Sequence, residues 1–325
     1  MESSSPKYIL VTGGAGYIGS YVNEKLHQKG YNTIVLDNLQ TGCREAVKKG
    51  IFLQGDLRDN TLLDQLFTDY PIKGIMHFAG SLNVGESIKD PLKYYANNVS
   101  ATINLLTTMH KHQIQFFVFS STAVIFGTPQ TDQIAENHPT NPLSPYGKSK
   151  AMVEGILQDL DSAYGLKYCC LRYFNVAGGD PKRKHKNYNS SQSNLIPTAL
   201  RVLQTPGEVF SLFGTDYDTP DQTAIRDYIH IDDLASAHIA ALEKLFRDEV
   251  SESYNLGNGT GSSVKEVLST IEKITGKKIP IIEKERRAGD APVYVANPAK
   301  AHKELGWAPK YPSIEEIILH TWQSM

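Results

Sequence analysis

One tyrosine in the segment SPYGKSK, which begins at Ser144, lies close to two lysines. A phenol with its ordinary pKa of about 10 is a poor base at neutral pH, and a nearby cation favours the phenolate. Ser144 can cap a helix, and Pro145 suits its first position. On such a helix Lys150 shares a face with Tyr146, whereas Lys148 points to nearly the opposite side. We therefore predict that Tyr146 is an acid/base assisted by Lys150; a packed tyrosine beside two exposed lysines is the alternative.

A second hydroxyl stands at the end of an apolar run, in the segment FSSTAVIFG. Ligands of open α/β sheets bind at the carboxyl ends of the strands. Thr122 could therefore hold the same substrate oxygen from which Tyr146 removes a proton. The alternative is an ordinary polar strand end.

Three glycines follow the first apolar run, in the segment VTGGAGYIGS. Gly13, Gly16 and Gly19 are evenly spaced, and the segment also satisfies G-x-G-x-x-G. A Cβ here would block the tight turn, the approach of a pyrophosphate or the packing of the helix on the strand. The helix N-terminus then offers free N–H groups and partial positive charge to phosphates. Tight turns use glycine freely, so this pattern needs further support.

That support comes from Asp37, which ends the next apolar run. An acid at this place accepts hydrogen bonds from the adenosine ribose and would repel the 2′-phosphate of NADP. The alternative is a solvated aspartate at a strand end. We predict NAD, and not NADP, as the cofactor.

The elements that must position these residues alternate along the first half of the chain. Strands are predicted at 8–12, 32–37, 51–56, 74–79, 116–121 and 167–174, and helices at 17–29, 59–69, about 90–112 and 145–164. This order predicts an α/β fold, a Rossmann-type doubly wound parallel sheet with helices on both faces. The nearly continuous apolar runs predict strands that are buried on both faces.

The regular alternation ends near residue 178, where a polar segment beginning AGGDPKRKHK follows. Apolar helical stretches come later, at 233–246 and 263–275. We predict an NAD-binding domain over 1–178 and a smaller α/β substrate-binding domain over 179–325, and leave open that the chain crosses between the two.

Composition narrows the class of protein. The chain has 325 residues, 40% of them hydrophobic, and 33 basic against 35 acidic residues, a net charge of −2. The chain has no excess of basic residues that would favour nucleic acid as a partner. It also lacks an apolar run of about 18 residues, the length of a membrane span, so a cytoplasmic location is expected. The three cysteines show no spacing typical of a zinc site, and no metal is predicted.

Several segments, in order along essentially the whole chain, resemble the extended short-chain dehydrogenase/reductase family. They are TGGAGYIG, DNL, GDL, HFAG, NNV, SST, YGKSK and LRYFNVAG, and later SNLIP, FGTDYDTPDQTAIRDYIHIDDLASAH, YNLGNGTGSSV and RRAGDAPVYVANPAKAHKELGW. Within the family the chain is most similar to the enzymes that epimerise UDP-hexoses. The resemblance implies reversible C4 epimerisation of UDP-glucose and UDP-galactose, through a 4-keto intermediate and transient hydride transfer to bound NAD.

The resemblance also implies roles for single residues. Tyr146 would be the acid/base, Lys150 its activator and ribose anchor, and Thr122 the hydroxyl partner. Cofactor-binding residues would be Gly13, Gly16, Tyr17, Ile18, Gly19, Asp37, Asn38, Asp56, Leu57, Phe78, Ala79, Asn98, Lys150 and Phe174. Substrate-binding residues would be Thr122, Tyr146, Asn175, Asn194, Leu195, Phe213, Arg226, Arg287, Asp290 and Tyr294.

Among the substrate-binding residues, Arg226 and Arg287 would neutralise the UDP diphosphate, a task that suits guanidinium groups. Asp290 would reach the uridine ribose. Members of the family commonly pair through two helices of the first domain, which implies a homodimer through the helices at about 90–112 and 145–164.

Three features depart from the family pattern. Phe126 stands where many members have tyrosine, a change that we expect to leave the packing the same. Leu82 and Asn83 occupy a loop where some epimerases place a lysine near the cofactor. The loop 180–193 is unusually basic, and a solvated loop is the simplest interpretation of it.

Three other functions were weighed. A dehydratase of this fold needs an Asp-Glu pair after the threonine, where this chain has Ala123 and Val124. An epimerase of another UDP-sugar, such as UDP-N-acetylglucosamine, UDP-xylose or UDP-glucuronate, stays open. In the family the position of Tyr294 limits the size of the sugar, so its ring predicts exclusion of N-acetyl groups. A non-catalytic sensor would be expected to lose Tyr146 or Lys150.

Overall fold

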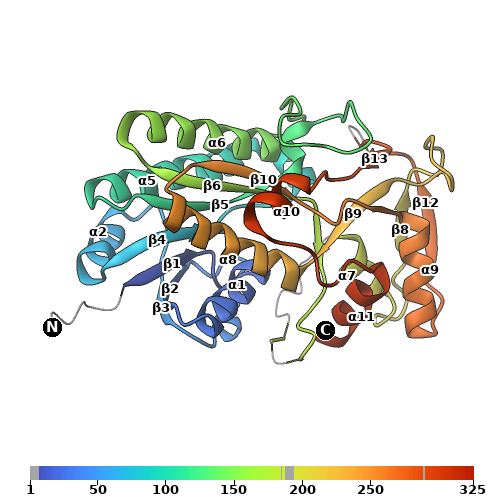
Figure 1. Ribbon diagram of the computed structural model, residues 1–325. Coiled ribbons are helices and arrows are strands. Elements are labelled where there is room, and N and C mark those ends of the chain that lie inside the picture. The colour runs from blue at the N-terminus through green and yellow to red at the C-terminus, as the bar shows by residue number, and fades with distance from the viewer. Residues whose placement is uncertain (1–6, 184, 187–193, 288–289) are drawn as a thin grey trace. The chain divides into compact units, whose positions relative to one another are not determined.

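The computed structural model describes residues 7–183, 185–186, 194–287 and 290–325 (Figure 1). A seven-stranded sheet has the order β10-β6-β5-β4-β1-β2-β3. Its strands are β1 (Tyr8–Thr12), β2 (Asn32–Asp37), β3 (Ile51–Gln54), β4 (Ile72–His77), β5 (Phe116–Thr122), β6 (Lys167–Tyr173) and β10 (Glu252–Leu256). The pairs from β3 to β5 are parallel. The strand order reverses between β1 and β4, as in doubly wound dinucleotide-binding folds, so the predicted fold class is confirmed.

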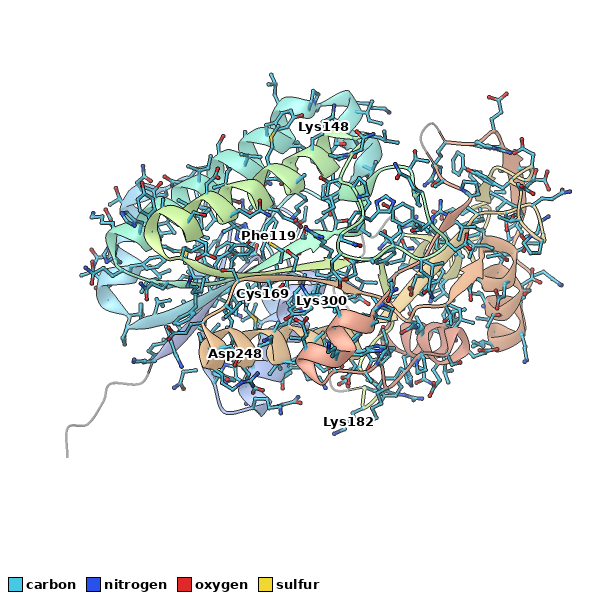
Figure 2. All side chains as sticks on the ribbon, turned by 45° about the horizontal axis from the view of Figure 1, so that its top comes forward. Phe119, Lys148, Cys169, Lys182, Asp248 and Lys300 are labelled. Atoms are coloured by element: carbon cyan, nitrogen blue, oxygen red, sulfur yellow. The ribbon has the colours of Figure 1, made fainter. Side chains whose placement is uncertain are left out.

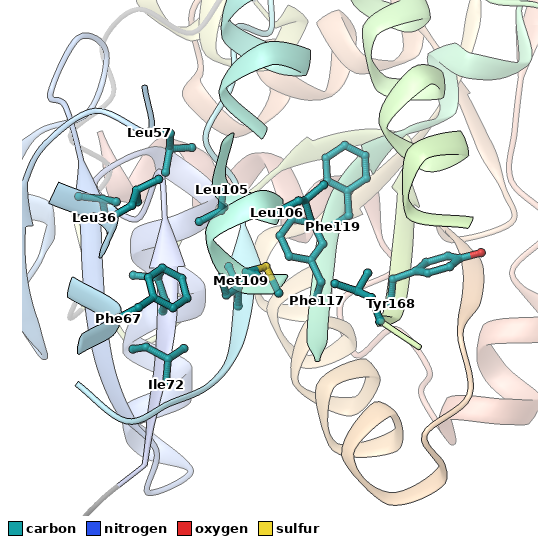
Figure 3. Close-up of a cluster of buried hydrophobic side chains, with 14 of the residues drawn as sticks. Leu36, Leu57, Phe67, Ile72, Leu105, Leu106, Met109, Phe117, Phe119 and Tyr168 are labelled. Carbon is teal, nitrogen blue, oxygen red and sulfur yellow. The ribbon is translucent and has the colours of Figure 1, made fainter. Parts of the chain in front are cut away.

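Helices cover both faces of this sheet. They are α1 (Tyr17–Gln28), α2 (Asn60–Asp69), α5 (Ala101–Lys111), α6 (Pro145–Tyr164) and α8 (Ile231–Asp248). Figure 1 shows α5 and α6 on one face and α1 and α8 on the other. Figure 3 shows the core under α5, where Leu105, Leu106 and Met109 meet Phe117 and Phe119 of β5. Burial of each such side chain stabilises the fold by roughly 1.5–3 kcal/mol.

Three expectations about the elements were wrong in detail. The strand expected at 74–79 begins and ends two residues earlier, as β4. β3 ends at Gln54, and its four residues are half-buried or exposed, because β3 is the edge strand and has no neighbour on one side. The helix expected at about 90–112 is broken into α4 (Pro91–Tyr94), a π-helical segment Tyr95–Ser100 and α5. A short helix that no pattern predicted, α3 (Val84–Lys89), precedes them.

The chain forms two compact units. The first consists of Met1–Ile125, Pro142–Arg172 and Ala235–Ser253; the second consists of Phe126–Asn141, Tyr173–Leu234 and Tyr254–Met325. The chain therefore leaves the first unit and returns to it twice, and a stretch beyond residue 178 completes the first unit. The assignment of cofactor and substrate to the domains 1–178 and 179–325 stays a prediction.

The second unit contains two small sheets. One has the order β11-β9-β13, with β7 also paired to β9, and the other pairs β12 with β8. Its elements are β7 (Asn175–Ala177), α7 (Leu195–Val202), β8 (Phe210–Phe213), β9 (Ile225–His230), β11 (Gly261–Ser263), α9 (Val264–Thr275), β12 (Ile281–Lys284), β13 (Val293–Tyr294), α10 (Ala299–Leu305) and α11 (Ile314–Ser324). Their apolar side chains form a separate core that includes Leu200, Ile271 and Ile317.

Candidate active site

The backbone around the turn between β1 and α1 leaves no room for a side chain at Gly13 or Gly19. Gly13 has a φ of +68°, and a Cβ on it would lie 2.5 Å from the backbone nitrogen of Ala79. A Cβ on Gly19 would collide with the carbonyl oxygen of Gly13. Gly16 caps α1, while Tyr17 and Ile18 begin that helix half-buried. The helix N-terminus thus offers bare backbone to a phosphate, and the expected cofactor residues Gly13 and Ala79 lie against each other.

Asp37 is fixed beside this turn by backbone N–H groups. Its Oδ2 accepts a hydrogen bond from Ala15 N at 2.9 Å, and its Oδ1 accepts one from Leu39 N at 2.8 Å. An ionised carboxylate can accept about four hydrogen bonds, so two lone pairs are left for ribose hydroxyls.

A hydrogen bond joins the carboxyl end of β3 to the carboxyl end of β2. Asn38 Nδ2 donates to Asp56 Oδ2 at 2.9 Å, and the guanidinium of Arg58 holds the pKa of Asp56 well below its usual range. Leu57 is buried next to Asp56. The residues expected around the adenine therefore gather at the carboxyl ends of β2 and β3, where such folds bind nucleotides.

The start of α6 places the tyrosine and the two lysines. Ser144 Oγ accepts a hydrogen bond from Gly147 N at 3.1 Å, and Pro145 is the first residue of the helix. Tyr146 is 8% exposed and Lys150 is 2% exposed, whereas Lys148 lies on the outer face, as the helical spacing predicts (Figure 2). Lys150 Nζ donates to Ser120 O at 2.8 Å.

Burial controls the protonation of these groups. It raises the pKa of Tyr146 to about 12, while the hydrogen bond with Thr122 acts in the opposite direction. Burial also lowers the pKa of Lys150 to about 8, against the charge of Glu154, which raises it. The expected lowering of the tyrosine pKa is therefore not produced by the protein groups: desolvation outweighs them. A cation bound beside the phenol would counteract that desolvation.

Asn98 ties the loop after β4 to α6. Its Oδ1 accepts from Ser81 N at 2.7 Å, and its Nδ2 donates to Ser81 O and to Ser149 Oγ, both at 3.0 Å. Asn98 belongs to the π-helical segment, a type of turn that is frequent at functional sites. Gly80 lies in the same place, because a Cβ on it would be 3.1 Å from Asn98 Oδ1 and 3.6 Å from Lys150 Nζ.

A chain of hydrogen bonds behind Asn98 escaped the sequence patterns. Thr102 Oγ1 donates to Asn98 O at 2.7 Å, so its oxygen accepts from His77 Nε2 at 3.0 Å. His77 Nδ1 then accepts from Thr12 Oγ1 at 2.7 Å. Burial lowers the pKa of His77 to about 3, so the imidazole is neutral. The chain connects β1, β4 and α5 beneath the site.

Other residues at the site also had no sequence signal of their own. Glu154 and Arg172 form a buried ion pair, and Ser121 donates to the same carboxylate. Only the four-residue spacing from Lys150 to Glu154 could have pointed to it. The Phe78 ring packs on His238, with ring centres 5.0 Å apart.

In the second unit, three expected substrate residues and the expected cofactor residue Phe174 gather around β9 and β13. Arg226 forms an ion pair with Asp290, and Tyr294 is the strand partner of Arg226. The rings of Phe174 and Tyr294 are 5.6 Å apart, and burial raises the pKa of Tyr294. These residues thus form one cluster of aromatic and charged groups.

The remaining substrate residues lie in other places of the same unit. Arg287 lies with its guanidinium 4.1 Å from the centre of the Phe213 ring. Asn175 Nδ2 donates to Asp227 O at 3.3 Å. Asn194 caps α7, which begins at Leu195.

The structure gives the surroundings of most residues that depart from the family pattern. Phe126 is almost fully buried, with its ring edge-on to His138. Asn83 caps α3 by accepting from Glu86 N at 2.9 Å, and Leu82 is exposed. Part of the basic loop, residues 184 and 187–193, lies outside the described residues; Lys182 is exposed (Figure 2).

The described ranges contain neither a candidate metal site nor a candidate membrane-spanning helix. No group of three or more histidine, cysteine, aspartate or glutamate side chains there could hold a metal ion. None of the helices in the same ranges combines the length and the apolar character needed to cross a membrane.

Comparisons with known proteins agree along the chain. Residues 9–257 match the family model described as the NAD dependent epimerase/dehydratase family. A UDP-glucose 4-epimerase of Halalkalibacterium halodurans is 48% identical over 314 residues, which are 97% of this chain and 94% of the relative. The structure of UDP-glucose 4-epimerase from Brucella ovis in complex with NAD is 40% identical, with a TM-score of 0.94 and 97% of each chain covered. The enzyme from Bifidobacterium longum in complex with NAD⁺ and UDP is 36% identical, with a TM-score of 0.90 and 98% of each chain covered.

Proposed function

Because the chain belongs to the NAD dependent epimerase/dehydratase family, we propose that it interconverts UDP-glucose and UDP-galactose by inverting the configuration at C4. One observation carries the proposal. A buried tyrosine, a buried lysine one turn later and a threonine hydroxyl bonded to that tyrosine meet at the end of β5 and the start of α6.

The first unit fits NAD. The turn that a Cβ on Gly13 or Gly19 would fill, the N-terminus of α1 and the acceptor lone pairs of Asp37 suit a pyrophosphate and an adenosine ribose. NAD held there would supply the acceptor for the hydride of C4 of the sugar and the donor that returns it to the opposite face. The cofactor is regenerated, so the reaction is an isomerisation.

The residues of the chain move the proton. Tyr146 removes the proton of the C4 hydroxyl as the carbon is oxidised, and Thr122 holds the same oxygen by its own hydroxyl. Lys150 keeps a positive charge near the phenolate, which desolvation otherwise disfavours. After the 4-keto sugar has turned, Tyr146 returns the proton to the oxygen of the opposite epimer.

The second unit is assigned the sugar nucleotide. Arg226 and Arg287 neutralise the diphosphate, and Asp290 binds the uridine ribose. Arg226 and Asp290 form an ion pair with each other, which supports assigning them to neighbouring parts of one ligand. Tyr294 and Phe174 together limit the space beside the sugar.

We further propose that the protein is a homodimer. Four large apolar side chains are exposed on neighbouring helices of the first unit: Ile88 on α3, Leu92 on α4, Ile103 on α5 and Met152 on α6. Large apolar side chains exposed on neighbouring helices are a feature of many protein–protein interfaces. The proposed partner is a second copy of the chain. We also propose a cytoplasmic location, as expected from the sequence.

The test is a coupled assay of UDP-galactose conversion to UDP-glucose, run beside N-acetylated and pentose UDP-sugars. We expect turnover of UDP-galactose and none comparable of UDP-N-acetylgalactosamine. The Tyr146→Phe variant should fold normally and lose nearly all turnover, because it keeps the ring and lacks the proton-transferring oxygen. Rates near those of the unaltered protein in that variant would refute the assignment.

A further inference from the structure

A buried ion pair lies one helical turn beyond Lys150. The guanidinium of Arg172, on β6, donates to the carboxylate of Glu154, on α6, with Nη2–Oε2 at 2.6 Å and Nε–Oε1 at 3.0 Å. Ser121 Oγ, on β5, donates to the same carboxylate. Glu154 and Arg172 are both buried. The carboxylate is therefore held by three donors from two strands.

Stability alone is a weak explanation for this pair. Removing two charges from water costs free energy, and replacing a buried ion pair by apolar side chains of similar volume is often neutral or stabilising. Removing one partner, by contrast, leaves a buried charge unpaired. The position of the pair relative to the reacting groups is therefore the more informative observation.

That position links the pair to Lys150. Lys150 and Glu154 are four residues apart on α6 and share one face of the helix. Lys150 binds the carbonyl of Ser120, and Glu154 binds the hydroxyl of the next residue, Ser121. Both charged groups are thus anchored to the stretch of β5 that ends at Thr122.

Four titratable groups around this place, on β4, β6 and α4, are uncharged at neutral pH. On β4, His77 is neutral. On β6, burial and the charge of Glu154 raise the pKa values of Tyr168 and Cys170. On α4, burial raises the pKa of Tyr94, whose ring meets that of Tyr146 edge-on with centres 6.4 Å apart.

One further carboxylate reaches this group. The Tyr94 hydroxyl donates to Glu86 at 2.8 Å, and that carboxylate is surface-exposed and paired with Lys93. Water and its partner screen the charge of Glu86. Glu154 is therefore the buried charge that acts on Lys150, and Arg172 is the ion-pair partner of Glu154.

Resting on the proposed function, we propose that Glu154 and Arg172 are positioning residues whose opposite charges set how many protons the Tyr146–Lys150 pair holds at the working pH. Glu154 favours the charged form of Lys150, which burial disfavours, and Arg172 offsets the negative charge of the Glu154 carboxylate with which it is paired. Under the proposed function the charge of Lys150 stabilises the Tyr146 phenolate, so the two ionisations belong to the pair, and a change in nearby charge moves both in the same direction.

The test compares pH–rate profiles of UDP-galactose conversion. Glu154→Gln removes one negative charge and should move the whole profile to lower pH, by about one unit or more. Glu154→Asp keeps the charge and should leave the profile in place. The double variant Glu154→Gln/Arg172→Met removes both charges and should return the profile toward its original position.

A matched control removes a carboxylate from the exposed face of the same helix. Asp159→Asn should leave the profile unchanged, since Asp159 is exposed to solvent. If Glu154→Gln does not fold, Arg172→Met tests the proposal from the other side and should move the profile to higher pH. Profiles that stay in place when either charge alone is removed would overturn the proposal.

A second measurement does not depend on activity. The absorbance of the Tyr146 phenolate is obtained by titrating each protein and subtracting the same protein with Tyr146→Phe. Its midpoint should fall in Glu154→Gln and stay unchanged in Glu154→Asp. An inactive parent protein with this shift would refute the proposed function alone, and an active one without the shift would refute only the role of the pair.

Discussion

At the scale of single residues, the surroundings of Tyr146 decide whether it can act as a base. Burial raises its pKa to about 12, so the phenol needs positive charge nearby before it gives up its proton near neutral pH. Lys150 is buried on the same face of α6 and would supply such a charge under the proposed function; Lys148 is turned to solvent. We therefore expect Lys150, and not Lys148, to affect the rate of the reaction.

The first prediction compares these lysines. Lys150→Met should lower kcat for UDP-galactose by about 100-fold or more, since acid–base groups contribute roughly that much to a rate. Lys148→Met, on the exposed face, should change kcat by no more than about twofold. Steady-state kinetics of both variants, with thermal unfolding to show that both fold, give the comparison. Equal losses in the two variants would contradict the assignment.

A second prediction concerns Tyr294. Tyr294→Ser removes the ring that packs near Phe174 and should raise the rate on UDP-N-acetylgalactosamine relative to UDP-galactose by about tenfold or more, a change of ~1.4 kcal/mol in discrimination. Tyr294→Phe keeps the ring and should keep the exclusion. The measurement is the ratio of kcat/KM for the two substrates. An unchanged ratio in the serine variant would mean that another residue limits the size of the sugar.

At the scale of elements, local patterns predicted what local interactions decide. β1 and β2 have the predicted bounds because each is a continuous apolar run, and α6 begins at Pro145 because Ser144 caps it. β3 differs because its exposure depends on having no outer neighbour, which only the sheet order reveals.

Contacts between distant segments were beyond those patterns. No motif spacing predicts the Glu154–Arg172 pair or the Thr12–His77–Thr102 chain, because both join residues far apart in sequence. The glycine turn and Asp37 could be placed beforehand because strand ends meet at one edge of a parallel sheet. The expected roles of single residues in binding stay predictions.

A third prediction follows from the chain of hydrogen bonds that joins β1, β4 and α5. His77 has an ordinary pKa of 6.5 when unfolded and one of about 3 in the fold. Between these values the unfolded chain binds a proton that the folded chain does not, so the stabilisation is complete above 6.5 and is lost as the pH falls toward 3.

The loss from pH 7 to pH 5 should be about 2 kcal/mol of unfolding free energy from this one group. Urea unfolding at the two pH values measures it. His77→Gln cannot bind the proton, so its loss between the same pH values should be smaller by that amount. An equal loss in both proteins would show that other groups cause the acid sensitivity.

At the scale of the whole molecule, two features matter: the apolar surface on α3 to α6 and the path of the chain between the two units. Leu92 is 78% exposed and Met152 is 48% exposed. A second copy covering these side chains would remove them from water, which favours association.

The fourth prediction tests that association. Met152→Glu should convert the dimer to a monomer, because a charge would be buried without a partner at the interface. Val250→Glu adds the same charge at an exposed apolar residue elsewhere in the first unit and should leave the dimer intact. Sedimentation velocity distinguishes the two states. A monomeric parent protein, or a dimeric Met152→Glu variant, would exclude this interface.

The path of the chain also sets the order in which the protein can be completed during synthesis. β6 pairs with β10, yet the residues from Tyr173 to Leu234 are made between them and belong to the other unit. At typical elongation rates the edge of β6 waits about 5–15 seconds for its neighbour to leave the ribosome. An unpaired strand edge is a template for aggregation, so nascent chains that stall in this interval should depend on chaperones more than finished ones.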